Sequence, residues 1–95
     1  MFVRITKYKI KDGSQDSAVD IMNGLKREIM ALSGMVQFIN SMDEDGNGHV
    51  IAVVDNKKAS EANAPRIKEI WANFADLLET TPFMEGHDVL ANWRN

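Results

Sequence analysis

The run Val50–Val54 places five apolar residues in succession just before Asp55. Side chains of a strand point alternately to its two faces, so a continuous apolar run of this length predicts a strand that is covered on both faces. A chain of 95 residues is long enough for one domain and too short for two. The fold must therefore cover both faces of a central strand with the few elements of a single domain, residues 1–95.

The remaining segments show two kinds of periodicity. Alternating or β-branched runs predict strands over Phe2–Ile10, Met35–Met42, His49–Asp55 and His87–Trp93. Apolar residues that recur every three or four positions predict amphipathic helices over Ala18–Leu32 and Ile67–Leu78. The order of elements is thus β-α-β-β-α-β.

This order predicts an α+β fold of the ferredoxin-like βαββαβ type, with a four-stranded antiparallel sheet and both helices on one face. The first and third strands are central in that topology, which agrees with the apolar run Val50–Val54. Two helices cover only one face of the sheet, yet the second and third predicted strands carry apolar residues on both faces. A second copy of the chain is the simplest cover, so we expect a homodimer formed through the open sheet face.

Several glycines lie within or between the predicted elements. Gly24 falls inside the first predicted helix, which it weakens by about 1 kcal/mol relative to alanine, and we expect a close packing contact there. Gly34 follows that helix and suits a left-handed terminal residue. Gly46 and Gly48 belong to a polar hairpin loop.

Composition excludes several classes of function. The net charge of −3 argues against nucleic acid as a partner, and no apolar run is long enough to cross a membrane, so we expect a soluble cytoplasmic protein. The absence of cysteine excludes disulfide scaffolds and thiolate ligands. The pattern Asp43-x-Asp45-x-Asn47 copies half of a calcium loop, but Val54 stands where the loop needs a bidentate glutamate. With only two histidines besides, we expect no metal site.

Trp71 and Phe74 on the second helix are followed by Thr81-Pro82-Phe83-Met84-Glu85-Gly86-His87 ahead of the last predicted strand. Together with the order of elements and the chain length, this run resembles the dimeric α+β barrel superfamily, in particular the antibiotic-biosynthesis-monooxygenase-like proteins. The resemblance covers the whole chain in architecture, although its motif is short. It implies a homodimer and a cofactor-independent monooxygenase acting on a small aromatic or polycyclic substrate. A non-catalytic homodimer of the same fold, which binds a small ligand or acts as a scaffold, is the alternative.

The superfamily also contains haem-degrading enzymes. These carry an asparagine in the first strand, where this chain offers Thr6 and Tyr8, and Leu77 stands at the position of their helical tryptophan. The resemblance therefore implies neither haem degradation nor any bound cofactor.

The resemblance also assigns roles. His87 would be the catalytic acid/base group, placed in a cavity between helices and sheet, because an imidazole can transfer a proton near neutral pH. Trp71 and Phe74 would form the wall of a pocket for a flat aromatic substrate. The alternatives are a histidine at a strand end bonded to a backbone carbonyl, and aromatic residues that only fill the core.

Arg4 and Tyr8 share a face of the first predicted strand with Phe2, and we expect Trp93 on the last strand and Asn40 on the second to lie beside them. A guanidinium and a phenol among aromatic rings could orient an anionic or phenolic substrate. Arginine, tyrosine and tryptophan are also enriched at protein interfaces, so the same face could lie in the dimer interface, which we favour.

Overall fold

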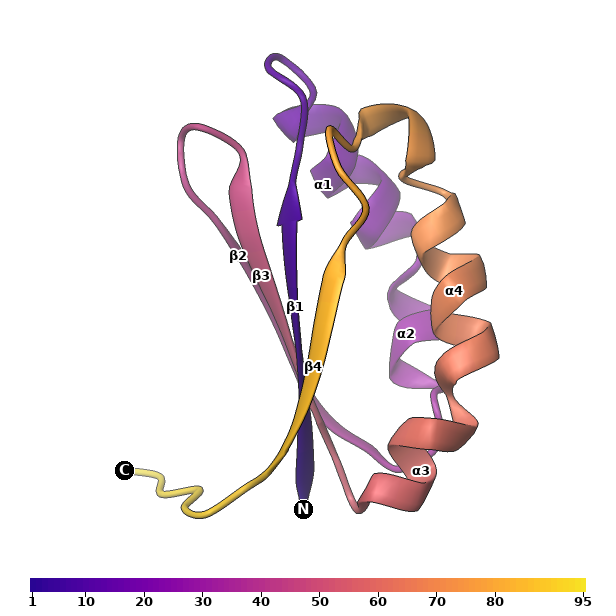
Figure 1. The fold of residues 1–95 in the computed structure, drawn as a ribbon, viewed down its shortest axis with the longest axis vertical. Helices are drawn as coiled ribbons and strands as arrows, with labels where there is room; N and C mark the ends of the chain where they lie inside the picture. Colours follow the sequence, from indigo (N-terminus) through magenta and orange to yellow (C-terminus); the bar gives the residue numbers. More distant parts are fainter.

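The computed structural model describes all residues, 1–95, and has two layers, a sheet and a set of helices packed on one of its faces (Figure 1). The strands are β1 (Phe2–Lys9), β2 (Met35–Met42), β3 (Asn47–Val54) and β4 (Phe83–Asp88). They form one antiparallel sheet in the order β2-β3-β1-β4. The predicted ferredoxin-like α+β fold is thus confirmed, with the first and third strands at the centre.

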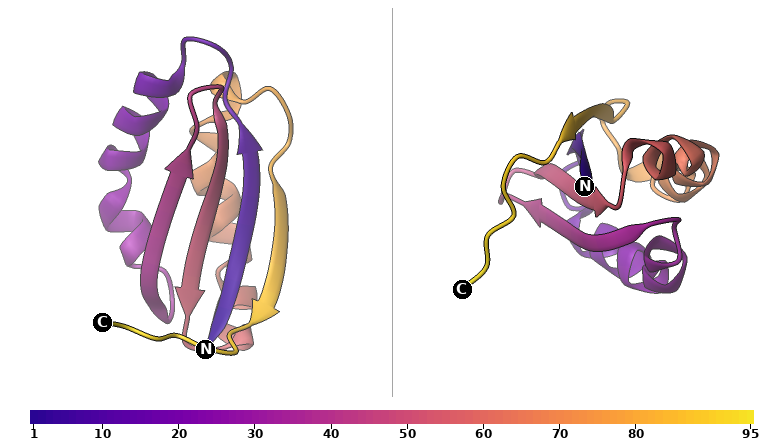
Figure 2. Two further views of the ribbon diagram at one scale, coloured as in Figure 1. Left: turned by 90° about the vertical axis from the view of Figure 1, so that its left-hand side faces the viewer. Right: turned by 90° about the horizontal axis from the view of Figure 1, so that it is seen from below.

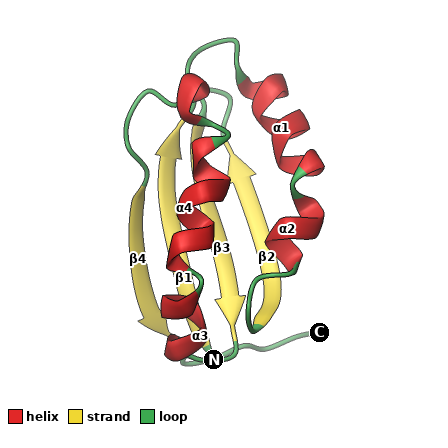
Figure 3. Ribbon diagram, turned by 90° about the vertical axis from the view of Figure 1, so that its right-hand side faces the viewer, coloured by secondary structure: helices red, strands yellow, loops and turns green.

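Four helices and one 3₁₀ turn cover a single face of this sheet (Figure 3). The helical elements are α1 (Gln15–Gly24), α2 (Lys26–Met30), α3 (Lys57–Ala62), α4 (Ala64–Ala72) and η1 (Ala75–Leu77). Seen from the opposite side, the four strands lie in front with every helix behind them (Figure 2). None of these helices has the length and apolar content that a bilayer span needs.

The first predicted helix is interrupted. It divides into α1 and α2 at Leu25, where ψ is 3° and departs from helical geometry. The Leu25 N–H donates to the carbonyls of both Ile21 and Met22. Gly24 supplies the weak point, because glycine gains least from helical order. The close contact expected at Gly24 is wrong, since a Cβ there would meet no atom within 4 Å. Gly34 has φ of 69°, as its predicted left-handed conformation requires.

The segment before the second predicted helix forms an extra helix, α3, that was not among the predicted elements. Asn56 begins it, because its side chain accepts a hydrogen bond from the Ala59 N–H at 2.8 Å. Asn63 separates α3 from α4, and its side-chain amide exchanges two hydrogen bonds of 2.9 Å with the backbone of Ser33. This buried amide fixes the helix pair against the loop that follows α2.

The last strand begins and ends earlier than predicted, at Phe83–Asp88 in place of His87–Trp93. β4 pairs with β1 from Lys7↔Phe83 to Phe2↔Asp88, and Phe2 is the first residue of β1. The Val89 N–H still bonds the Met1 carbonyl at 3.1 Å, but the residues after it have no strand beside them, and they extend as a tail on the open side of the sheet (Figure 1). The alternation from Val89 to Trp93 cannot form a ladder because its partner strand is exhausted.

Candidate functional site

A cavity of about 90 Å³ lies between the helix-covered face of the sheet and helices α1, α2 and α4. Seventeen of its 22 lining residues are hydrophobic. Its volume exceeds that of several water molecules and is well below the ~300–1,000 Å³ of pockets for drug-sized ligands. The space suits a single ring with short substituents, and a polycyclic substrate exceeds it.

Alternate residues of β1 supply part of the polar lining of the cavity. Arg4, Thr6 and Tyr8 all line it and thus face the helices. The expectation that Arg4 and Tyr8 lie in an interface on the open sheet face is wrong. Trp93 does not join them, because it lies in the C-terminal tail and is 93% exposed.

Tyr8 and Asn40 form the polar centre at one end of the cavity. The Tyr8 hydroxyl donates to Asn40 Oδ1 at 2.5 Å, and the Asn40 amide donates to Met22 Sδ at 3.0 Å. Gly48 lies opposite Tyr8 on β3, and the tyrosine ring covers the space where a Cβ of Gly48 would stand. The glycine thus allows the Tyr8 side chain to lie along the sheet toward Asn40 on β2.

Burial raises the pKa of the Tyr8 phenol above its usual value of 10.0, and the hydrogen bond with Asn40 partly offsets this rise. The phenol is therefore protonated at neutral pH and acts as a hydrogen-bond donor. The cavity wall contains no aspartate, glutamate or histidine, so Arg4 and Tyr8 are its only titratable residues.

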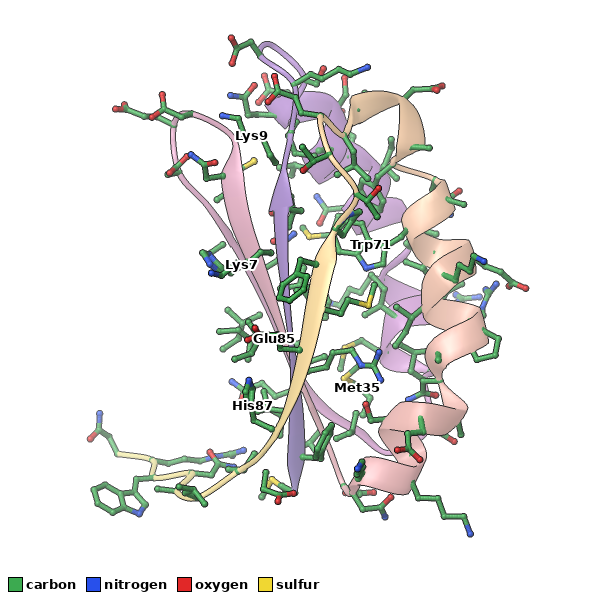
Figure 4. The ribbon with its side chains drawn as sticks, in the orientation of Figure 1. Lys7, Lys9, Met35, Trp71, Glu85 and His87 are labelled. Carbon is green, nitrogen blue, oxygen red and sulfur yellow. The ribbon has the colours of Figure 1, made fainter.

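Trp71 lies in α4, Phe74 lies two residues after its end, and both line the cavity. The ring centroids of Trp71 and Tyr8 are 5.5 Å apart and those of Trp71 and Phe74 are 5.7 Å apart, with the planes tilted by 55° and 56°. Such tilted contacts hold the indole in a fixed orientation over the cavity. Figure 4 shows Trp71 on the helix side of the sheet.

Arg4 occupies another part of the wall, near α3. Its Nε and Nη2 donate to Ser60 Oγ at 3.2 and 2.8 Å, and Nη2 also reaches the Ser60 carbonyl at 3.2 Å. Ser60 is 2% exposed, so it fixes the guanidinium from inside the protein.

His87 is not part of this cavity, and its expected place there is wrong. It pairs in register with Val3 on β1 and projects from the open face beside Glu85 (Figure 4). Its Nε2 lies 3.4 Å from Glu85 Oε2, and 55% of its side chain is exposed. Its catalytic role stays a prediction.

Asn40, expected beside Arg4 and Tyr8, does line the cavity, whereas Ser60 is a cavity residue that the sequence interpretation missed. Asn40 had a detectable signal, since it is a polar residue between Phe38 and Met42 on an otherwise apolar strand face. Ser60 had none, because it lies in a segment that was not predicted to be helical.

The hairpin between β2 and β3 uses its acidic residues for its own backbone. Asp43 Oδ1 accepts the N–H groups of Asp45 and Asn47, each at 2.9 Å. The Asn47 backbone bond is the main cause that lowers the pKa of Asp43. No group of three or more histidine, cysteine or acidic side chains in the protein is arranged to hold a metal ion.

Neither a protein-family model nor a curated protein matches this sequence. Solved structures do match its fold. A Nitrosomonas europaea protein described as of unknown function, NE2512, aligns with a TM-score of 0.83 at 18% identity, over 99% of this chain and 93% of that one.

Two further structures carry a functional name. A "putative antibiotic biosynthesis monooxygenase" from Nitrosomonas europaea aligns with a TM-score of 0.80 at 13% identity, over 96% of this chain and all of the other. One of the same name from Deinococcus radiodurans gives 0.79 at 11%, covering 100% and 98%. The fold is antibiotic-biosynthesis-monooxygenase-like. The fold of the single chain implied by the resemblance is therefore confirmed, while identities this low leave the reaction to be argued from the cavity.

Proposed function

We propose that the chain is a cofactor-independent monooxygenase that oxidises a small phenol in the cavity between sheet and helices. The observation that supports this proposal is the cavity itself, which is an apolar space for one ring with the Tyr8–Asn40 pair in its wall. Trp71 and Phe74 offer the aromatic surface that a flat substrate prefers.

The reaction needs no external electron source. An ionised phenol transfers an electron to O₂, and the resulting phenoxyl radical and superoxide join at a ring carbon as a peroxide anion, which takes up a proton from water to become a hydroperoxide. Loss of water then breaks the O–O and C–H bonds and leaves a quinone, so that one oxygen atom enters the product and the other leaves as water. The four electrons that reduce O₂ all come from the substrate.

The protein's part in this reaction is to bind, orient and exclude water. The second N–H of the Asn40 amide can donate to the phenolate oxygen, which bears more charge once the proton has left, and the neutral Tyr8 hydroxyl can do so when its proton turns from Asn40 Oδ1 to the substrate. The apolar wall shields the phenolate from protonation by solvent. Since the wall holds no carboxylate or imidazole, the proposed reaction uses water as the base that takes the phenol proton.

A non-catalytic ligand-binding protein is the second candidate. The observation that favours it is the same absence of a protein acid/base group, since binding alone requires only the apolar wall and the hydrogen-bond donors. Both candidates use the same cavity and differ only in whether O₂ reacts there.

We also propose that the chain forms a homodimer through its open sheet face. The centre of this face carries the apolar residues Val3, Ile5, Ile39, Ile51 and Val53, which lie in register across β1, β3 and β2. Ile39 and Phe83 are 44% and 58% exposed in the single chain. The C-terminal tail, which contains Leu90 and Trp93, both more than 90% exposed, extends to the same side (Figure 2). A second copy would remove this apolar surface from water.

The experiment is oxygen uptake by the purified protein with single-ring phenols whose para position is free, with no flavin, haem or metal added. We expect one O₂ consumed per quinone formed. Tyr8→Phe should lower the rate roughly 10²-fold, the usual cost of one such donor. Lys68→Met, on an exposed position of α4, is the matched control and should leave the rate unchanged. Binding without oxygen uptake would leave the ligand-binding candidate, and full activity in Tyr8→Phe would place the reaction elsewhere.

A further inference from the structure

The Arg4 guanidinium is a cation without a counter-ion. It is half-buried and points from β1 into the wall of the apolar cavity. Its partners are the hydroxyl and carbonyl of Ser60, both neutral, and the thioether of Met84, which lies 3.8 Å from Nη1. The ion pairs of this protein all lie elsewhere and are exposed, at Lys57–Glu61, Arg66–Glu69 and Glu85–His87.

Removing a charge from water without a partner is costly, and a thioether is a weak acceptor for a guanidinium N–H. The cavity wall holds no acidic residue that could swing across to pair with Arg4. Ser60, meanwhile, holds the Nε and Nη2 edge and leaves Nη1 with only the Met84 sulfur. Because Arg4 lines the cavity, an anion that enters it can pair with this nitrogen by displacing only a weak contact to sulfur.

We propose that Arg4 binds the carboxylate of the cavity's ligand, so that the substrate is a small hydroxyaryl carboxylate. This rests on the proposed function for the identity of the cavity as the binding site. A monocarboxylate matches the single positive charge, whereas a phosphate dianion would need further cations that the wall lacks.

The spacing along β1 supports a ligand with two polar ends. Arg4 and Tyr8 are four residues apart on one face of the strand, which places their Cα atoms about 13 Å apart at ~3.3 Å per residue. The wall between them is mainly apolar, with Val50 and Ala52 on the neighbouring strand. The carboxylate lies at Arg4, the ring in the apolar centre, and the hydroxyl at the Tyr8–Asn40 pair.

The test compares two ligands that differ only in charge, 3-(3-hydroxyphenyl)propanoate and its primary amide, by isothermal titration calorimetry with the full chain. We expect the carboxylate to bind the wild type about 10–100-fold more tightly, the range of a charge-assisted hydrogen bond of ~1.5–3 kcal/mol. Equal affinities, or no binding of either ligand, would overturn the proposal without any variant. This comparison therefore decides the matter even if changes at Arg4 impair folding.

Variants then assign the preference to Arg4. In Arg4→Met the two ligands should bind equally, and Arg4→Lys should keep part of the preference because it keeps the charge without the planar fork. Arg66→Met, which removes an exposed arginine of α4, is the matched control and should keep the full preference. A preference that survives in Arg4→Met would overturn the proposal.

The outcome is separable from that of the oxygenase proposal. A charge preference with no oxygen uptake would support the carboxylate site and reject the oxygenase. Oxygen uptake with equal affinities for acid and amide would do the reverse.

Discussion

Adding one methyl group at Gly48 or at Gly24 should change stability in opposite directions. Neither glycine has a positive φ, so the backbone accepts alanine at both positions. At Gly48, a Cβ would overlap the ring of Tyr8, whereas at Gly24 it would meet nothing within 4 Å. The two substitutions are matched in chemistry and differ only in what surrounds the new atom.

Gly48→Ala forces the Tyr8 ring away from the sheet. Overpacking of this kind costs ~1–3 kcal/mol, and the displaced ring also gives up its contact with Trp71 and its hydrogen bond to Asn40. Because alanine is otherwise better than glycine within a strand, we expect a net loss of about 2 kcal/mol. For a domain of this size that lowers the melting temperature by roughly 8–16 °C.

Gly24→Ala should stabilise the protein by ~0.5–1 kcal/mol, since it removes the conformational freedom of glycine at the end of α1. The melting temperature should rise by about 2–8 °C. Thermal and urea unfolding followed by circular dichroism measure both changes.

A double substitution isolates the cause. In a Tyr8→Thr background, Gly48→Ala should cost nothing, because the ring that it displaces is gone. Ligand affinity should also fall in Gly48→Ala and stay unchanged in Gly24→Ala. If Gly48→Ala were as stable as the wild type, or remained destabilising without the tyrosine ring, the described packing of Tyr8 over Gly48 would be refuted.

Three further predictions concern the pH dependence, the histidine on the open face and the assembly. Because the pKa of Tyr8 is raised in the folded state, the stability that its neutral form contributes is complete below pH ~10 and is lost as the pH rises through the folded pKa. The free energy of unfolding should therefore fall above pH ~10. The fall should be smaller in Tyr8→Phe. His87→Ala should leave ligand affinity and oxygen uptake unchanged, because the ring lies on the opposite face of the sheet from the cavity; a loss of turnover would instead support the catalytic role predicted from the sequence. Sedimentation should show a dimer at micromolar concentration whose interface exceeds ~1,200 Å² in total, and deletion of residues 89–95 should weaken it; a stable wild-type monomer would exclude the open-face dimer.

The sequence by itself determined the topology. The period of the apolar residues separates strands from helices, and the βαββαβ order then allows few arrangements, which is why the central position of Val50–Val54 was predictable. The left-handed Gly34 was predictable as well, because a helix end and a glycine define that conformation locally. These features depend on neighbours in the chain.

Only the tertiary structure decided which strand face lines the cavity. Along β1 both faces carry residues that can be buried, Val3 and Ile5 on one and Phe2 and Thr6 on the other, so the alternation alone does not choose between them. The packing of α1, α2 and α4 made the choice, and it placed Arg4 and Tyr8 inside. Register is set by pairing between distant segments, and a shift of one residue moves a side chain to the other face.

The same dependence on distant partners explains His87 and the end of β4. His87 pairs with Val3, so it takes the open face that Val3 takes, whatever its own neighbours in sequence are. β4 stops at Asp88 because β1 begins at Phe2, more than eighty residues away in the chain. A strand exists only where a partner supplies its hydrogen bonds, and the residues after Asp88 therefore form a tail in spite of their alternating pattern.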